Sequence, residues 1–158
     1  MDPRSKTPPV GLTERFTLGS QAWTAMNQDF DALEKIRGLR EVLKEKQNQT
    51  TGGLTDSVTA LDQKVASIAG AGGGGRRGRG NAGSSENLSS LNGEFAEVLR
   101  NLETSDQTPT TQTAAALTAL RKSLDASLAQ WSAIQTRDIP AINIELKKVN
   151  LPLIQAPK

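Results

Sequence analysis

Apolar side chains recur every three or four residues through most of this chain, which is the spacing of one face of an α-helix. The clearest example has steps of four, three, four and three residues, at Leu54, Val58, Leu61, Val65 and Ile68. A half-buried strand would instead alternate apolar and polar residues with a period of two. The pattern predicts an all-α protein whose helices pack their apolar stripes against one another.

The longest helix is predicted from residue 12 to about residue 49, a length of about 57 Å at 1.5 Å per residue. We interpret its larger apolar residues as one stripe that faces the core: Phe16, Trp23, Met26, Phe30, Leu33, Ile36, Leu39 and Leu43. Gly52 and Gly53 follow, and glycine commonly supplies the left-handed backbone of a C-terminal cap. A tight reversal and a second, short helix ending near Gly70 are therefore predicted.

Two more helices are predicted in the second half of the chain. The third has apolar positions at Leu88, Leu91, Phe95, Val98, Leu99 and Leu102, and ends in the polar stretch 104–107. Thr108 and Pro109 suit the N-cap and the first position of the fourth helix. This helix carries Leu117, Leu120, Leu124, Leu128, Trp131 and Ile134 on one face. Beyond it, Asp138 and Pro140 either begin a new helix or bend a continuous one.

These signals divide the chain into five segments. They are an extended lead-in at 1–11, a first helical hairpin at 12–69, a Gly/Arg-rich linker at 70–85, a second helical hairpin at 86–150 and a C-terminal tail at 151–158. The linker has no large apolar residue, so it cannot offset its ordering entropy by burial. It is predicted to be flexible.

Two arrangements accommodate one long first helix, two short middle helices and a long last helix. In the favoured one, an antiparallel up-down bundle of four helices, the short pair covers only one end of the long helices. Phe16, Trp23 and Met26 would then face Ile142, Leu146 and Val149 at the other end, where self-association or a partner would cover them. The alternative is a three-helix bundle in which the two short helices lie end to end as one broken middle helix.

Composition argues against an enzyme. The chain has no histidine, cysteine or tyrosine, so the usual proton shuttle, the commonest metal ligand and the thiolate nucleophile are all missing. Glycine is abundant, but no Gly-Lys pair followed by Ser or Thr forms a phosphate-binding loop. We predict no catalytic residue, no cofactor, no metal site and no small-molecule substrate. No apolar run reaches the roughly 20 residues that a membrane span requires.

Arg76, Arg77 and Arg79 lie among glycines and resemble the tracts that bind RNA through charge and stacking. No aromatic residue is interleaved with them, and 19 basic residues are almost balanced by 17 acidic ones. We interpret the segment as a linker and predict no nucleic-acid partner. Recognition of an anionic polymer or a cell-surface ligand by this tract is the alternative function.

Two other groups of residues are candidates for sites. Glu94, Glu97 and Glu103 are spread along one helix with nothing to pair them as acid and base, so they are interpreted as a solvated face. Trp23 and Trp131 could form an aromatic ligand platform, but both lie in apolar stripes at helical spacing. We predict that both tryptophans pack in the core.

Four stretches resemble a known family: the opening MDPRSKTPPVGL, ALEKIR at 32–37, DQTPTTQ at 106–112, and a terminal pattern from Trp131 through DIPAIN at 138–143 to LPL at 151–153. They are similar to the C-terminal part of large exported bacterial proteins of the sortilin-like, glycosyl-hydrolase-like Asp-box (BNR) β-propeller class. The resemblance covers nearly the whole chain and transfers no active-site residue. It implies a secreted or cell-surface protein in which Met1 is internal to a larger precursor.

The residues and the resemblance together predict a non-catalytic structural or assembly module. The expected partner is a second copy of the chain, or an adjacent domain or protein, contacted through apolar helical surface.

Overall fold

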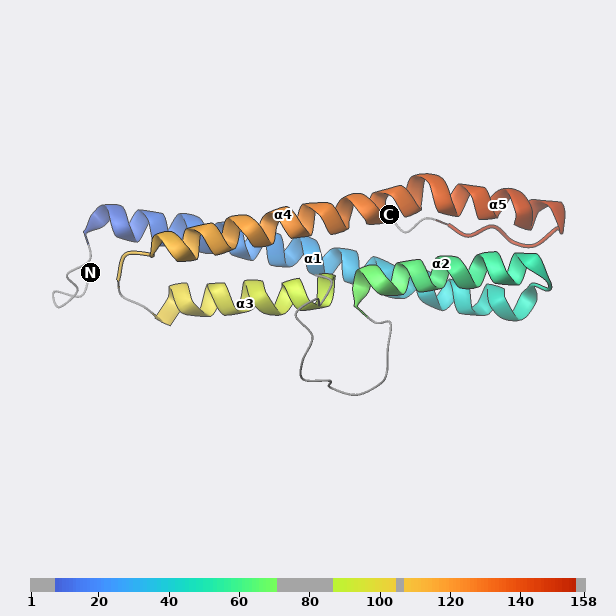
Figure 1. The fold of residues 1–158 in the computed structure, drawn as a ribbon, viewed down its shortest axis with the longest axis horizontal. Coiled ribbons are helices and arrows are strands. Elements are labelled where there is room, and N and C mark those ends of the chain that lie inside the picture. The colour runs from blue at the N-terminus through green and yellow to red at the C-terminus, as the bar shows by residue number, and fades with distance from the viewer. Residues whose placement is uncertain (1–7, 71–86, 105–106, 156–158) are drawn as a thin grey trace.

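The computed structural model describes residues 8–70, 87–104 and 107–155 of the 158-residue chain. The described part is helical, with a long first helix and a long last one, as Figure 1 shows. The elements are α1 (Pro9–Gln49), α2 (Gly53–Ala69), α3 (Leu88–Thr104), α4 (Thr111–Ala133), a π-helical turn (Ile134–Asp138) and α5 (Ile139–Lys148). The prediction of an all-α bundle is confirmed.

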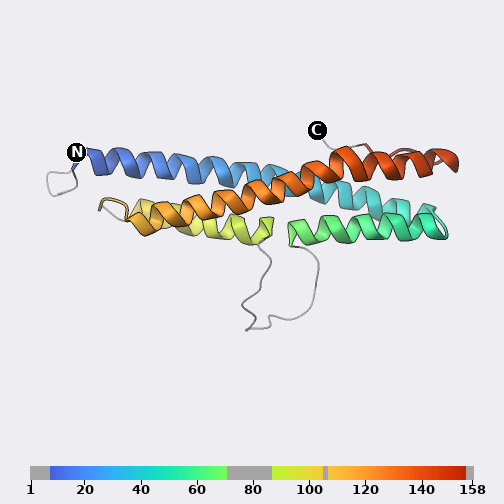
Figure 2. The same ribbon diagram turned by 45° about the horizontal axis from the view of Figure 1, so that its top comes forward.

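The helices form three rods. α1 is one rod, α4 continues through the π-helical turn into α5 as the second, and α2 and α3 lie end to end as the third (Figures 1 and 2). The Ser89 hydroxyl of α3 donates to the carbonyl of Ala69 at the end of α2 over 2.6 Å, which ties the two short helices together. This is the arrangement with the broken middle helix, not the up-down bundle of four helices that we favoured.

The consequence is that α1 and the α4–α5 rod run in the same direction. The first half of α1 packs with α3 and α4, and its second half packs with α2, which also contacts α5 (Figure 2). The expected meeting of Phe16 and Trp23 with Ile142 and Leu146 is therefore wrong, because these pairs lie at opposite ends of the molecule. Each short helix covers a different half of α1, so neither end is left as a two-helix layer.

The helix boundaries differ from the predictions at two N-termini. α1 begins at Pro9 rather than at residue 12, because proline suits a first turn in which its missing N–H has no partner to lose. α4 is capped by Thr110 rather than Thr108, and the Thr110 hydroxyl accepts a hydrogen bond from the backbone N–H of Thr113 at 3.2 Å. α2 ends at Gly70 as predicted, and this C-cap has left-handed backbone, with φ of 81°. The glycine cap predicted for the end of the first helix is wrong, because the C-cap of α1 is Thr50 in extended backbone.

Pro140 lies inside the last rod without ending it. Asp138 has helical backbone angles and makes no side-chain cap, so the continuous helix is the alternative that the structure shows. The wider π-helical turn directly precedes the proline ring, and such turns commonly accommodate a break in the hydrogen-bond ladder.

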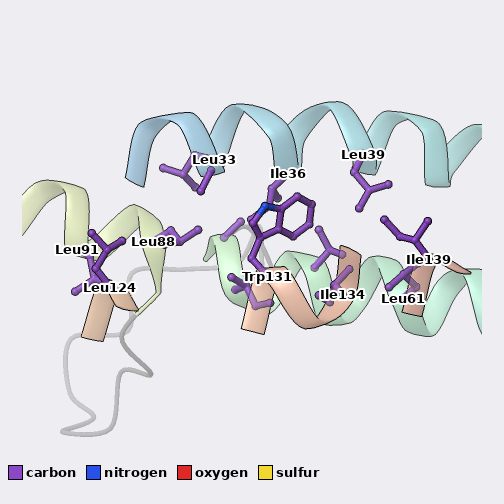
Figure 3. Packing of buried hydrophobic residues seen from close by; sticks show 14 of the residues in the cluster. Leu33, Ile36, Leu39, Leu61, Leu88, Leu91, Leu124, Trp131, Ile134 and Ile139 are labelled. Atoms are coloured by element: carbon purple, nitrogen blue, oxygen red, sulfur yellow. The ribbon is translucent and has the colours of Figure 1, made fainter. Parts of the chain in front are cut away.

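A single core runs along the three rods. Figure 3 shows Leu33, Ile36 and Leu39 of α1 facing side chains from every other rod, with the indole of Trp131 among them. Trp131 is buried, which confirms its prediction as a core residue. The tail returns to this core, because Asn143 exchanges two hydrogen bonds with the backbone of Ile154, at 2.7 and 2.8 Å, and Ile154 is buried.

The predicted linker at 70–85 lies, apart from Gly70, outside the described residues, and so do most of the lead-in and the end of the tail.

Candidate protein-interaction site

The first half of α1 turns small side chains towards its neighbours. Its buried positions include Ala22, Ala25, Asp29 and Ala32, spaced three, four and three residues apart. The same spacing continues at Ile36, Leu39 and Leu43 in the second half. Alanine has a short side chain, so α3 can lie close to α1 where these residues face it.

The aromatic side chains of this half point outwards as a result. Phe16 is 76% exposed, Trp23 is 54% exposed and Phe30 is 50% exposed. The predictions that Trp23 packs in the core and that Phe16 and Phe30 face it are wrong. The physical reason is that the alanines and the aromatics form two adjacent stripes of the same helical period, and only the smaller side chains fit between closely packed helices.

The three aromatics lie on one side of the helix because they are seven residues, or nearly two turns, apart. Apart from Trp23, the exposed residues between Phe16 and Phe30 are all polar and uncharged: Thr17, Ser20, Gln21, Thr24, Asn27 and Gln28. We call this surface, from Phe16 to Phe30, the aromatic face. Its one ionisable residue, Asp29, points inwards and is buried. By contrast, residues 31–46 carry a charge at more than half of their positions.

An open groove of about 560 Å³ runs along this face between α1 and α3. Leu12, Phe16 and Trp23 are its large apolar residues on α1, and Leu99 and Leu102 are those on α3. Arg15 of α1 and Glu103 of α3 also line it and add one charge of each sign. Gly19 forms part of the floor, where a Cβ atom would lie 3.9 Å from Leu99. The groove is thus a mainly apolar channel that runs parallel to two helices and is open to solvent.

Asp29 lies beneath this region as an isolated buried carboxylate. Neither of its oxygens has a hydrogen-bond partner among the described residues. Burial raises its pKa from 3.8 to about 6, and the nearby amide of Asn92 on α3 offsets only part of that rise. The Asn92 amide donates to the Met26 carbonyl over 3.5 Å. With no second acid or base beside it, Asp29 is a polar residue of the helix interface rather than a reactive group.

The remaining candidates from the sequence do not come together as a site. Glu94, Glu97 and Glu103 are exposed along α3, as predicted, and Glu97 forms an ion pair with Arg100 at 2.8 Å. Arg76, Arg77 and Arg79 lie outside the described residues. The described part of the chain contains no group of three potential metal ligands.

None of the described helices combines the length and the apolar character that crossing a bilayer requires.

A few further apolar side chains are exposed at the opposite end of the molecule, among them Ile144 of α5 at 61%. They do not form a regular stripe. The aromatic face is therefore the most extended apolar surface that the described residues present.

Comparison of this chain with protein-family models, with curated proteins and with solved structures gives no match.

Proposed function

We propose that this chain is a non-catalytic assembly module that binds an apolar helix of another polypeptide through the aromatic face of α1. The observation that carries the proposal is the exposure of Phe16, Trp23 and Phe30 at intervals of two turns. Water contact with apolar surface costs about 25 cal/mol per Å², and large aromatic side chains contribute most of the energy of many protein interfaces.

A helix is the partner that this geometry fits. Seven-residue spacing places the aromatics in a line of about 21 Å, parallel to the axis of α1. This is the spacing by which paired helices interlock side chains along their contact. The groove beside Trp23, between α1 and α3, offers a second wall for the same helix.

Two further predictions from the sequence, binding of an anionic polymer and a place in an exported bacterial protein, do not support this proposal. Binding of an anionic polymer would involve Arg76, Arg77 and Arg79, and no described feature favours it over the aromatic face. The place of the module as an appendage of an exported bacterial protein stays a prediction from the resemblance.

The fluorescence of Trp23 tests the proposal directly. The chain has two tryptophans, so Trp131→Phe leaves Trp23 as the only one. Titration with a neutral amphipathic helical peptide that carries leucine at heptad spacing is expected to shift the Trp23 emission to the blue. A rising concentration of the protein itself is a second titration. A peptide of the same composition without an apolar face is expected to have no effect.

Matched variants separate the aromatic face from general apolar binding. Phe16→Gln with Phe30→Gln removes most of the expected shift, whereas Ile144→Gln, at an equally exposed position of α5, leaves it unchanged. An emission spectrum that responds neither to the amphipathic peptide nor to protein concentration would overturn the proposal.

A further inference from the structure

We infer that the helix bound by the aromatic face is α1 of a second copy of this chain, paired antiparallel about a two-fold axis at Trp23. This inference rests on the proposed function, and names the partner.

The aromatic face is complementary to itself. Phe16 and Phe30 are each seven residues from Trp23. When a second α1 lies antiparallel with its Trp23 at the same level, each Phe16 therefore meets the other copy's Phe30, and the two indoles meet at the axis. An interface in which the same patch serves both copies closes as a dimer and leaves no aromatic of the stripe without a counterpart.

The lack of charge favours an identical partner over one of different chemistry. The exposed side chains from Phe16 to Phe30 carry no charge, so an acidic or basic partner would find no ion pair on this face. Two copies meet there without the repulsion that like charges cause across an interface. Ser20 and Asn27 follow Phe16 and Trp23 by four residues, so they lie on the same side of α1 between the aromatics, and their uncharged side chains belong to the contact.

The charges beyond Phe30 select the antiparallel direction. In a parallel, in-register pair, Asp31, Glu34 and Arg37 would each lie beside their own copy, and like charges would meet at every turn. In the antiparallel pair, Glu34, eleven residues after Trp23, lies level with Leu12, eleven residues before it. Arg37 likewise lies level with Pro9. The beginning of α1 has two charged residues, Glu14 and Arg15, and in this register Arg15 lies level with Asp31 of the other copy, which has the opposite charge.

The size of the contact predicts a reversible dimer. The aromatic face extends about 21 Å along one helix, whereas a stable interface commonly buries about 800 Å² on each partner. The aromatic faces with the adjoining groove wall at Leu99 give a smaller contact, so dissociation on dilution is expected.

Distances between spin labels test the inference. The chain has no cysteine, so Thr24→Cys and Glu34→Cys each introduce one labelling site, and both positions are exposed. In the antiparallel pair, the separation of equivalent residues along the helix axis grows by about 3 Å for each residue away from Trp23, twice the helical rise. We expect a short intermolecular distance at position 24, where the axial separation is about 3 Å, and a much longer one at position 34, where the axial separation is about 33 Å.

The possible results are distinct. Short distances at both positions would show a parallel pair and overturn the inference. No intermolecular distance at any concentration would exclude the second copy, and if the amphipathic peptide still shifted the Trp23 emission, the proposed function would stand without it. As a control, the same labels with Phe16→Gln, Trp23→Gln and Phe30→Gln in place are expected to report no pairing, while circular dichroism shows unchanged helix content.

Discussion

Asp29 is an ionisable residue in a buried environment. It occupies a position of the buried stripe on α1, between alanines, and its carboxylate has no hydrogen-bond partner among the described residues. A charged carboxylate without a partner is costly to bury, so the folded state favours the protonated form.

The stability of the fold should therefore depend on the titration of Asp29. Its pKa is about 6 in the folded state and 3.8 in the unfolded one. Because the folded pKa is raised, the free energy of unfolding falls as pH increases through this window, by on the order of 3 kcal/mol, and is level above it. Asp29→Asn cannot ionise, so it is expected to lack this loss and to be more stable than the unsubstituted chain at pH 7. Urea unfolding of both proteins across the window measures the difference.

Subtracting the pH profile of the free energy of unfolding of Asp29→Asn from that of the unsubstituted chain removes the contribution of every other carboxylate. Profiles that stay parallel from pH 4 to pH 7 would mean that water or a rearrangement relieves the buried charge.

The two tryptophans show how far the burial of single residues can be predicted from the sequence. Both lie in apolar stripes, yet Trp131 is buried and Trp23 is 54% exposed. On the predicted helices, charged residues mark the side that faces water, and the stretch from Phe16 to Phe30 has none on its surface. The signal that could have corrected the prediction is the neighbouring stripe of Ala22, Ala25 and Ala32, which are three and seven residues apart.

At the scale of elements, the lengths of the helices could be predicted and their stacking could not. Glycine and polar segments mark where helices end, which is a local property. A connection as long as 70–85 permits either a reversal or a continuation, so the sequence left both arrangements open. The structure shows continuation, with Ser89 bonded to the end of α2.

Shortening the connection between α2 and α3 tests this stacking. Gly70 and Asn87 are adjacent, since a Cβ atom on Gly70 would lie 2.1 Å from the Asn87 side-chain oxygen. Deleting residues 71–83 should therefore leave both helices in place and raise the free energy of unfolding by about 1 kcal/mol, because a shorter loop loses less entropy on closure. Chemical unfolding followed by circular dichroism measures it. A large loss of helix or of stability would show that α2 and α3 need the full connection.

The same deletion tests the alternative function. Binding to an anionic polymer that is lost with residues 71–83 would support the Arg-Gly tract, whereas unchanged binding would remove it from consideration.

Two glycines are expected to respond oppositely to alanine. Gly70 has φ of 81° and meets Asn87, so Gly70→Ala should destabilise the fold by at least 1–2 kcal/mol, roughly the cost of left-handed backbone for an L-residue. Gly38 lies within α1 with open space around it, so Gly38→Ala should stabilise the fold by about 1 kcal/mol. Thermal unfolding compares them. Equal effects at both positions would contradict the roles assigned to them.

At the scale of the whole molecule, α2 and α3 pack against different halves of α1. The second half is highly charged, and the first bears the aromatic face. The fold class could be predicted from apolar periodicity. Because this periodicity extends along most of the chain, assigning one stripe to the wrong side of a helix does not change the predicted fold class. Self-association was predicted from unequal helix lengths, but the broken rod covers both ends of α1. The proposal depends on Phe16, Trp23 and Phe30, which the apolar pattern of the sequence predicts in the core and the structure places at the surface.

Sedimentation equilibrium of the 158-residue chain over a wide range of concentration tests pairing through the aromatic face. We expect an average mass that rises from that of one chain towards that of two. The variant with Gln at positions 16, 23 and 30 should stay at one chain throughout, and Ile144→Gln should behave as the unsubstituted protein does. A mass of one chain at every concentration, or equal association by the aromatic-face variant, would contradict it.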